Sequence, residues 1–303
     1  MVESRSTSRS GTGQSGSLES SLGGYLRARR ALVSPEEAGL PVTGLRRVPG
    51  LRREEVAGLV GVSIDYYVRL EQGRADRPSA EVLEALARAL RLGSAERAHL
   101  FDLARPRRSR QAGRAERPEG LRPGLVRVVD AILTTPAVVL NQYTDVLAWN
   151  PLAAVLIADF AALAPQRRNM ARLIFLDLAA RQVHPDWERA ARDTVGILRM
   201  AAGRHPHQPA LVRLVGELSL GSEAFRRLWA SHHVHEKTHG PKVFHHPLVG
   251  ELALRYESFA VPGEAHQVLV VYTAPAGSAA EEALGFLGSL TAVPPGGTPV
   301  SAS

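Results

Sequence analysis

The sequence predicts two domains: an all-α domain, followed by an α+β domain with an antiparallel sheet. Three observations support this fold class. With 303 residues, the chain is too long for one ordinary domain and suits two. Residues 105–120 form a polar stretch rich in Arg, Pro and Gly, which is typical of a linker. Before this stretch apolar residues recur at helical spacing, whereas after it β-type and helical segments are mixed.

Composition sets the remaining boundaries. Residues 1–21 are polar, rich in Ser and Gly and without an apolar segment, so we expect a disordered lead and not a signal peptide. The helical domain is expected at 22–104, the α+β domain at 121–290 and a Pro/Gly/Ser tail at 291–303. Because apolar runs stay well short of the roughly 18 residues that span a bilayer, we expect a cytoplasmic protein without a membrane partner.

Five helices are expected in the first domain. Their ranges are 22–32, 52–60, 64–72, a segment that follows Ser79, and 94–103. In the second helix, Val56, Leu59 and Val60 form the apolar side that we expect to be buried. Gly61 breaks this helix, and Ser63 is a favourable N-cap for the next one.

The second domain alternates between β-type and helical segments. Strands are expected at 137–142, 146–149, 242–246, 250–259 and 266–274, and helices at 125–133, 151–163, 169–177, 186–202, 208–219 and 222–231. Asn150 followed by Pro151 is a strong helix start, because Asn caps the backbone and Pro fits the first turn. Two strands, several helices and three further strands predict an antiparallel sheet with helices on one face.

The excess of positive charge is confined to the first 120 residues. The whole chain has a net charge of +7. Residues 1–120 hold 21 basic residues, all arginine, against 15 acidic ones, whereas residues 121–303 hold 16 against 15. This asymmetry indicates a polyanionic partner for the first domain only. The chain has no cysteine, which excludes disulfide frameworks, thiolate metal sites and cysteine nucleophiles.

Residues 54–74 have the pattern of a helix-turn-helix, in which a short helix, a glycine turn and a second helix cross at a steep angle. Ala57 is small where the two helices must approach. Tyr67 and Leu70 are three residues apart and share the buried face of the helix expected at 64–72. The side chains left facing outward, where a major groove admits them, are Ile64, Asp65, Tyr66 and Arg69.

This stretch resembles a known family. With LRREEVA at 51–57 and DYYVRLEQGR at 65–74, it is similar to the phage-repressor, or XRE, type of helix-turn-helix and to the MmyB-like transcription regulators. The resemblance implies a five-helix, phage-repressor-like domain that binds double-stranded DNA. It implies base-reading roles for Ile64, Asp65, Tyr66 and Arg69, and phosphate contacts by Ser63, Gln72 and Arg74.

Chemistry suggests roles for other charged residues of this domain. Sequence-independent phosphate contacts are expected from Arg46, Arg47, Arg52 and Arg53. Glu71 is expected to pair with Arg30 of the first helix, because a carboxylate that faced the phosphates would repel them.

The resemblance to the MmyB-like regulators continues to about residue 290. Its motifs are DVLAWN at 145–150, RN at 168–169, FLD at 175–177, DW at 186–187, LR at 198–199, EL at 217–218, FRRLW at 225–229, HPLVGEL at 246–252 and VVY at 270–272. It implies a PAS-like fold with a buried pocket for a small hydrophobic, fatty-acid-like ligand. Candidate pocket residues are Trp149, Arg168, Asn169, Phe175, Trp229 and His232. Asn150 and Asn169 are also expected to be helix caps.

The expected function is a sequence-specific DNA-binding transcription regulator. We expect a homodimer on a pseudo-palindromic operator, an affinity tuned by the hydrophobic ligand, no catalysis, and no metal or cofactor beyond that ligand. The alternative is a DNA-binding protein whose second domain serves only dimerisation. Departures from the family pattern at Gln208-Pro209 and at 234–236 leave the identity of the ligand open.

A distant alternative is a zinc metalloprotease. HEKTH at 235–239 matches the motif H-E-x-x-H, and His245 follows at the spacing of a third zinc ligand. Gly240-Pro241 would end the required helix at once, Lys242 replaces a required glycine, and no methionine follows the motif. A looser hypothesis is that the histidines between 232 and 246 bind a regulatory metal or sense pH.

Overall fold

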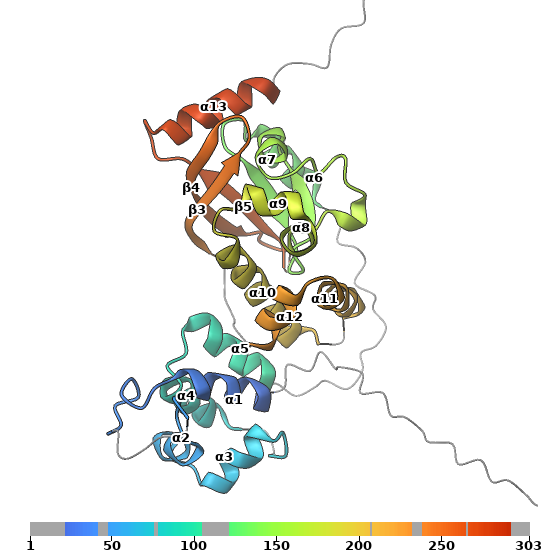
Figure 1. The fold of residues 1–303 in the computed structure, drawn as a ribbon. Helices are drawn as coiled ribbons and strands as arrows, with labels where there is room; N and C mark the ends of the chain where they lie inside the picture. Colours follow the sequence, from blue (N-terminus) through green and yellow to red (C-terminus); the bar gives the residue numbers. More distant parts are fainter. Residues whose placement is uncertain are drawn as a thin grey trace, which may run out of the picture.

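The computed structural model describes residues 22–41, 48–75, 78–104, 121–206, 208–231, 238–264 and 266–291. It contains a domain of helices at one end and a larger domain with a sheet at the other (Figure 1). The expected lead 1–21, the expected linker 105–120 and all but the first residue of the expected tail 291–303 lie outside the described residues.

The five helices expected in the first domain are confirmed, with boundaries shifted by one or two residues. They are α1 (Leu22–Leu32), α2 (Arg53–Val60), α3 (Ile64–Glu71), α4 (Ala80–Ala89) and α5 (Ser94–Ala104). The caps follow from the sequence, because the hydroxyl of Ser63 accepts a hydrogen bond from Tyr66 N and that of Ser79 accepts one from Val82 N.

One apolar core holds these helices together. Tyr25 and Leu26 of α1, Val56 of α2 and Tyr67 of α3 are completely buried in it. The expectation that Leu59 is buried was wrong, because 38% of this residue is exposed. Val56 and Ala57 already fill the side of this short helix that faces the core, and Leu59 falls outside that side.

The second domain contains a five-stranded antiparallel sheet in the order β2-β1-β5-β4-β3. The strands are β1 (Ala137–Leu140), β2 (Val146–Trp149), β3 (His239–His246), β4 (Gly250–Ala260) and β5 (Val268–Thr273). This confirms the expected PAS-like α+β fold. β3 begins three residues before its expected start, because it is an edge strand, where Pro241 removes no ladder hydrogen bond that the sheet requires.

Eight α-helices accompany the sheet in the described part of this domain. They are α6 (Pro123–Ala131), α7 (Pro151–Leu156), α8 (Met170–Leu176), α9 (Leu178–Val183), α10 (Trp187–Arg204), α11 (Pro209–Gly221), α12 (Glu223–Ala230) and α13 (Ala279–Thr291). The sequence did not predict α9 and α13. It also made α7 too long: Asp159 Oδ1 accepts from the backbone N–H groups of Ala161 and Ala162 and stabilises a turn in place of the helix.

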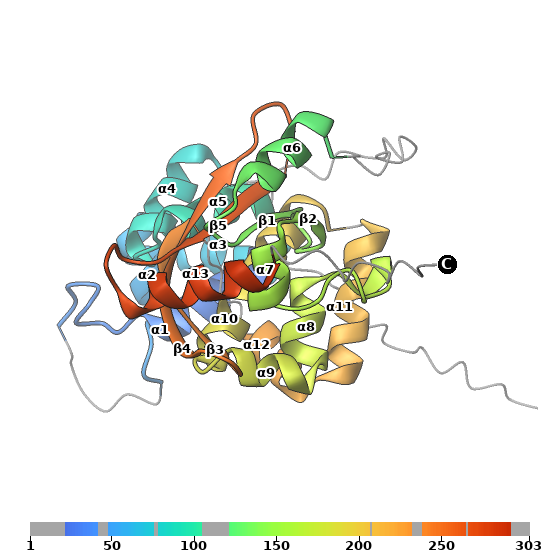
Figure 2. The same cartoon turned by 90° about the horizontal axis from the view of Figure 1, so that it is seen from above.

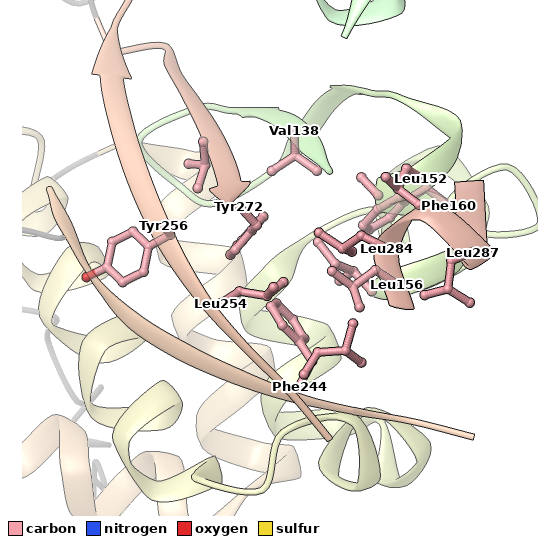
Figure 3. Close-up of a cluster of buried hydrophobic side chains, with 14 of the residues drawn as sticks. Val138, Leu152, Leu156, Phe160, Phe244, Leu254, Tyr256, Tyr272, Leu284 and Leu287 are labelled. Atoms are coloured by element: carbon pink, nitrogen blue, oxygen red, sulfur yellow. The ribbon is translucent and has the colours of Figure 1, made fainter. Parts of the chain in front are cut away.

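The sheet faces its main core on one side. Along β4, Leu252, Leu254 and Tyr256 are buried, whereas the residues between them are exposed. Figure 3 shows Leu254 and Tyr256 with Phe244 and Tyr272 of the neighbouring strands and with Leu284 of α13. Seen from above, α13 lies beside α7, and it contacts β4 as well (Figure 2).

The helix α10 joins this domain to the first domain. Its apolar side chains belong to a second core with α8, α11 and α12, but its Met200 packs into the core of the first domain. It contacts α5, and Arg204 Nε lies 3.1 Å from Asp102 Oδ2 across the boundary. Figure 1 shows α3 at the end of the first domain that lies away from α10. The outward side of α3 is therefore left clear by the second domain.

Candidate nucleic-acid interface

The turn between α2 and α3 sets the angle of the second helix. Gly61 has a φ of 78°, a left-handed conformation that favours glycine. The N–H groups of Gly61 and Val62 both lie 3.0 Å from Ala57 O, which satisfies a carbonyl left over at the end of α2. Tyr67 and Leu70 then anchor α3 in the core, as the sequence predicted.

Glu71 fixes the far end of α3. Its side chain is fully buried, and its two carboxylate oxygens accept hydrogen bonds from Arg30 Nε at 2.6 Å and from Arg53 Nε at 2.8 Å. The expected pair with Arg30 is confirmed. Burial alone would raise the pKa of Glu71, but hydrogen bonds and charges from both arginines outweigh it and hold the pKa below its usual value. Glu71 is thus a buried structural carboxylate.

The first helix approaches this anchor closely. Arg27 Nη2 donates to Glu71 O at 3.2 Å. A Cβ atom at Gly23 would lie only 2.2 Å from the same oxygen, so glycine is required at this contact. Neither Gly23 nor Arg27 was predicted from the sequence as a residue of this site. The pair Gly23-Gly24 inside a helix was the available signal, because glycine is otherwise unfavourable there.

The opposite side of α3 is open. Seven residues on and beside α3 were expected at the DNA, and six of them are exposed: Ser63, Ile64, Asp65, Arg69, Gln72 and Arg74. Tyr66 is half-buried and packs against the core of the domain. The structure therefore exposes three of the four expected base-reading side chains, Ile64, Asp65 and Arg69, whereas the expectation that Tyr66 faces fully outward was wrong.

The expected phosphate-contacting arginines differ in their surroundings. The backbone N–H of Arg52 donates to Glu55 at 2.6 Å, and its side chain, 41% exposed, points toward solvent 4.0 Å from Glu54. Arg53 is also partly exposed, at 46%, but its Nε is committed to Glu71. The two other expected arginines, Arg46 and Arg47, lie outside the described residues.

The expected ligand-binding residues divide between two clusters. Trp149 packs against the sheet core, and the guanidinium of Arg168 lies over its ring, 5.2 Å from the centroid. Phe175 and Trp229 belong to the other core, where both contact Phe225 at ring distances of 5.1 and 5.5 Å. His232 lies outside the described residues. Among the candidates that the structure describes, Trp149 therefore lies in a different cluster from Phe175 and Trp229.

The polar candidates have structural partners. Asn169 is fully buried and caps α8 by accepting from Arg172 N at 3.0 Å, and its amide donates to Tyr143 O and Asp145 Oδ1, both at 2.8 Å. Its expected role as a cap is confirmed. Arg168 Nε donates to Phe160 O at 2.8 Å and to Leu163 O at 3.1 Å.

The sequence did not single out Arg199 as a site residue. It is buried between α10 and α12, its guanidinium lies 4.4 Å from the centroid of the Trp229 ring, and it donates to Trp229 O. Burial lowers the pKa of Arg199 to about 10. A buried cation inside an aromatic cluster is the strongest candidate of this core for meeting an anionic group.

Both domains of the chain match models of known families. A model described as the MmyB-like transcription regulator ligand binding domain matches residues 121–287, and a model of a helix-turn-helix domain matches residues 21–100. The chain belongs to the MmyB-like transcription regulators. A search of curated proteins finds no match. With its helix-turn-helix and its ligand-binding domain, this MmyB-like protein is a DNA-binding transcription regulator.

The zinc-protease alternative requires HEKTH at 235–239 to lie on a helix, and the described end of this motif in the MmyB-like chain is not helical. His239, the second histidine of HEKTH, is the first residue of the strand β3, and residues 235–237 lie outside the described part. Two histidines share a helix face only where the helix continues between them. Within the described residues, no three side chains of the types His, Cys, Asp and Glu are grouped as a metal site would require.

Two further features bear on partners of the regulator. A hollow of about 60 Å³ lies between α10 and the strands β3 and β4, and both charged residues, such as Arg189 and Asp193, and apolar ones, such as Val243, line it. This volume is far below the roughly 300–1,000 Å³ that is typical of ligand pockets. Among the described helices, none has the length and apolar character needed to cross a membrane.

Proposed function

We propose that this regulator binds a pseudo-palindromic DNA operator as a homodimer in the cytoplasm, and that a small hydrophobic, fatty-acid-like effector in the second domain tunes the affinity. One observation carries the DNA part of the proposal. Side chains on one side of α3 are exposed, Glu71 anchors the last residue of this helix, and α3 lies at the end of the first domain away from α10 (Figure 1). Helices with this placement enter the major groove.

The proposed roles follow from side-chain chemistry. Arg69 has the geometry to donate two hydrogen bonds to guanine, a contact worth about 1–3 kcal/mol of discrimination. Asp65 accepts from the amino group of cytosine, and Tyr66 contacts the adjacent base edge. The remaining exposed groups position the helix by contacting phosphates: Ser63, Gln72, Arg74, Arg52 and the terminal amino groups of Arg53.

Selection of bound duplexes from a random pool, followed by fluorescence anisotropy on the selected sequence, tests this proposal. We expect a selected site with two related halves. Arg69→Ala should lower the affinity for this site about tenfold or more, and it should lose the preference for guanine at one base position in each half. Arg192→Ala is the matched control, because Arg192 is exposed on α10 and pairs with Glu188 far from α3. Recovery of no preferred sequence would refute DNA-sequence recognition.

The effector part of the proposal is supported by the character of the second core. Phe175, Phe225 and Trp229 form an aromatic cluster beside α10, and Arg199 places a cation against it. An aliphatic chain with an acidic head group matches this combination of apolar walls and one cation. Trp149 and Arg168 form a similar but smaller pair at the sheet core.

Tryptophan fluorescence offers a direct test of effector binding. All three tryptophans, Trp149, Trp187 and Trp229, lie in the second domain. We expect saturated fatty acids of 10 to 18 carbons to change the emission saturably, with Arg199→Leu weakening the response and the corresponding alcohols binding less well. The alternative, that the second domain serves only dimerisation, predicts no saturable response, and no small molecule in organic extracts of natively purified protein.

A further inference from the structure

The outward side of α3 carries one apolar side chain among polar ones. Within α3, all of whose residues are described, Ile64 is the only large apolar side chain that is exposed, at 52%. Asp65 and Arg69 beside it are exposed too. An isoleucine that remains exposed after folding contributes little to the core, so its apolar surface is available to a partner.

The position of Ile64 narrows the choice of partner. It is the first residue of α3 and follows the cap Ser63 directly, whose Oγ accepts from Tyr66 N at 3.2 Å and fixes the start of the helix. The first residues of a recognition helix are the ones that approach base edges. Val68 lies one turn after Ile64 on the same side of the helix and is half-buried. Ile64 and Val68 therefore form an apolar strip beside the exposed polar residues Asp65 and Arg69.

The major groove contains one apolar group, the 5-methyl group of thymine. We propose that Ile64 reads a thymine in each half of the operator by packing on this methyl group. The inference rests on the proposed function and adds a base class to it: Arg69 recognises guanine through hydrogen bonds, whereas Ile64 recognises thymine through apolar contact. The carboxylate of Asp65, next to Ile64, repels the negatively charged phosphates of the backbone. A contact of Ile64 with a base is therefore favoured over a contact with the backbone.

Replacement of single thymines by deoxyuridine tests the inference, because it removes only the methyl group. On the selected operator, we expect one thymine in each half to weaken binding about fourfold when replaced, the effect of one buried methyl-sized group. In Ile64→Ala this sensitivity should disappear at that position. In Ile64→Val, which keeps a branched side chain, most of it should remain.

Leu32→Ala is the matched control, because Leu32 is 62% exposed at the end of α1, outside the helix-turn-helix. It should keep the full response to uracil. Thermal unfolding of Ile64→Ala should match the wild type, because the residue is exposed. If the operator is bound specifically but no thymine responds, or if Ile64→Ala responds like the wild type, the methyl contact is wrong and the proposed function stands. If no operator is selected at all, the proposed function fails first.

Discussion

The imidazole of His99 on α5 lies directly against Gly203 on α10, so that each domain contributes one of the two residues. A Cβ atom at Gly203 would lie 2.6 Å from Cε1 and 2.7 Å from Nδ1 of that ring. The ring cannot easily move away, because His99 is buried and meets the Tyr25 ring edge-on at a centroid distance of 5.0 Å. The two domains are therefore in close contact at this point.

We expect Gly203→Leu to uncouple the domains. In the wild type, unfolding followed by tryptophan emission, which reports the second domain alone, should coincide with unfolding followed by far-ultraviolet circular dichroism, which reports both. In the variant the two curves should separate. Gly216→Leu is the control, since a Cβ atom at this glycine of α11 meets no described atom within 4 Å. Separate curves in the wild type, or coincident curves in Gly203→Leu, would contradict the expectation.

Glu71→Gln should destabilise the first domain by about 2 kcal/mol. The substitution leaves Arg30 and Arg53 beside a buried neutral group, and loss of one partner from a buried ion pair is costly; the partial exposure of Arg53 places the effect below the 3–5 kcal/mol of fully buried pairs. Urea unfolding measures it. Glu54→Gln should change stability by less than about 0.5 kcal/mol, because Glu54 is exposed and 4.0 Å from Arg52. Equal effects of both variants would argue against the anchor.

The pH dependence of this difference follows from the lowered pKa of Glu71. A carboxyl group whose pKa is lower in the folded state stabilises the fold above its unfolded pKa, and this contribution is lost as the pH falls through the folded value. The stability difference between the wild type and Glu71→Gln should thus be full at pH 7 and should shrink between about pH 5 and 3. A difference that stays constant over this range would show that charge is not its origin.

Local patterns carried most of the fold prediction. The strand expected at 250–259 is β4, in which the buried Leu252, Leu254 and Tyr256 alternate with exposed residues, and the expected caps Ser63 and Asn150 begin two helices. Local patterns failed where a distant contact decides the structure. The helix α13 has a weak local signal, because it contains glycines, and it is stabilised by burying Leu284 and Leu287 against α7 and β4.

The candidate site divides in the same way. The outward side of α3 could be predicted, because a helix of known phase exposes Asp65 and Arg69 once Tyr67 and Leu70 are buried. The second partner of Glu71, Arg53, and the contact of His99 with Gly203 could not, because they depend on how separate helices pack. The spacing of Trp149 and Trp229 along the chain likewise gave no sign that they belong to different cores.

Asn150 makes the most specific prediction for the second domain. Its Oδ1 accepts from the backbone N–H groups of Ala137 and Ala153, at 3.0 and 2.9 Å, and its Nδ2 donates to the carbonyls of Ile132 and Thr135, at 2.6 and 2.8 Å. A side chain that binds two N–H groups and two carbonyls needs both an acceptor oxygen and an NH2 donor, and an amide has both. The side chain thereby ties the end of α6, the start of β1 and the first turn of α7 together.

Asn150→Asp should therefore be nearly as harmful as Asn150→Ala. Aspartate keeps the acceptors but cannot donate, so two carbonyls would face a carboxylate in the interior, and we expect a loss of about 3 kcal/mol in the free energy of unfolding. Ser222→Ala, which removes only the cap of α12, should cost about 1 kcal/mol. Urea unfolding monitored by tryptophan emission measures all three variants. If Asn150→Asp kept wild-type stability, the two donor hydrogen bonds would contribute nothing, and the conformation of the segment before β1 would have to depend on other contacts.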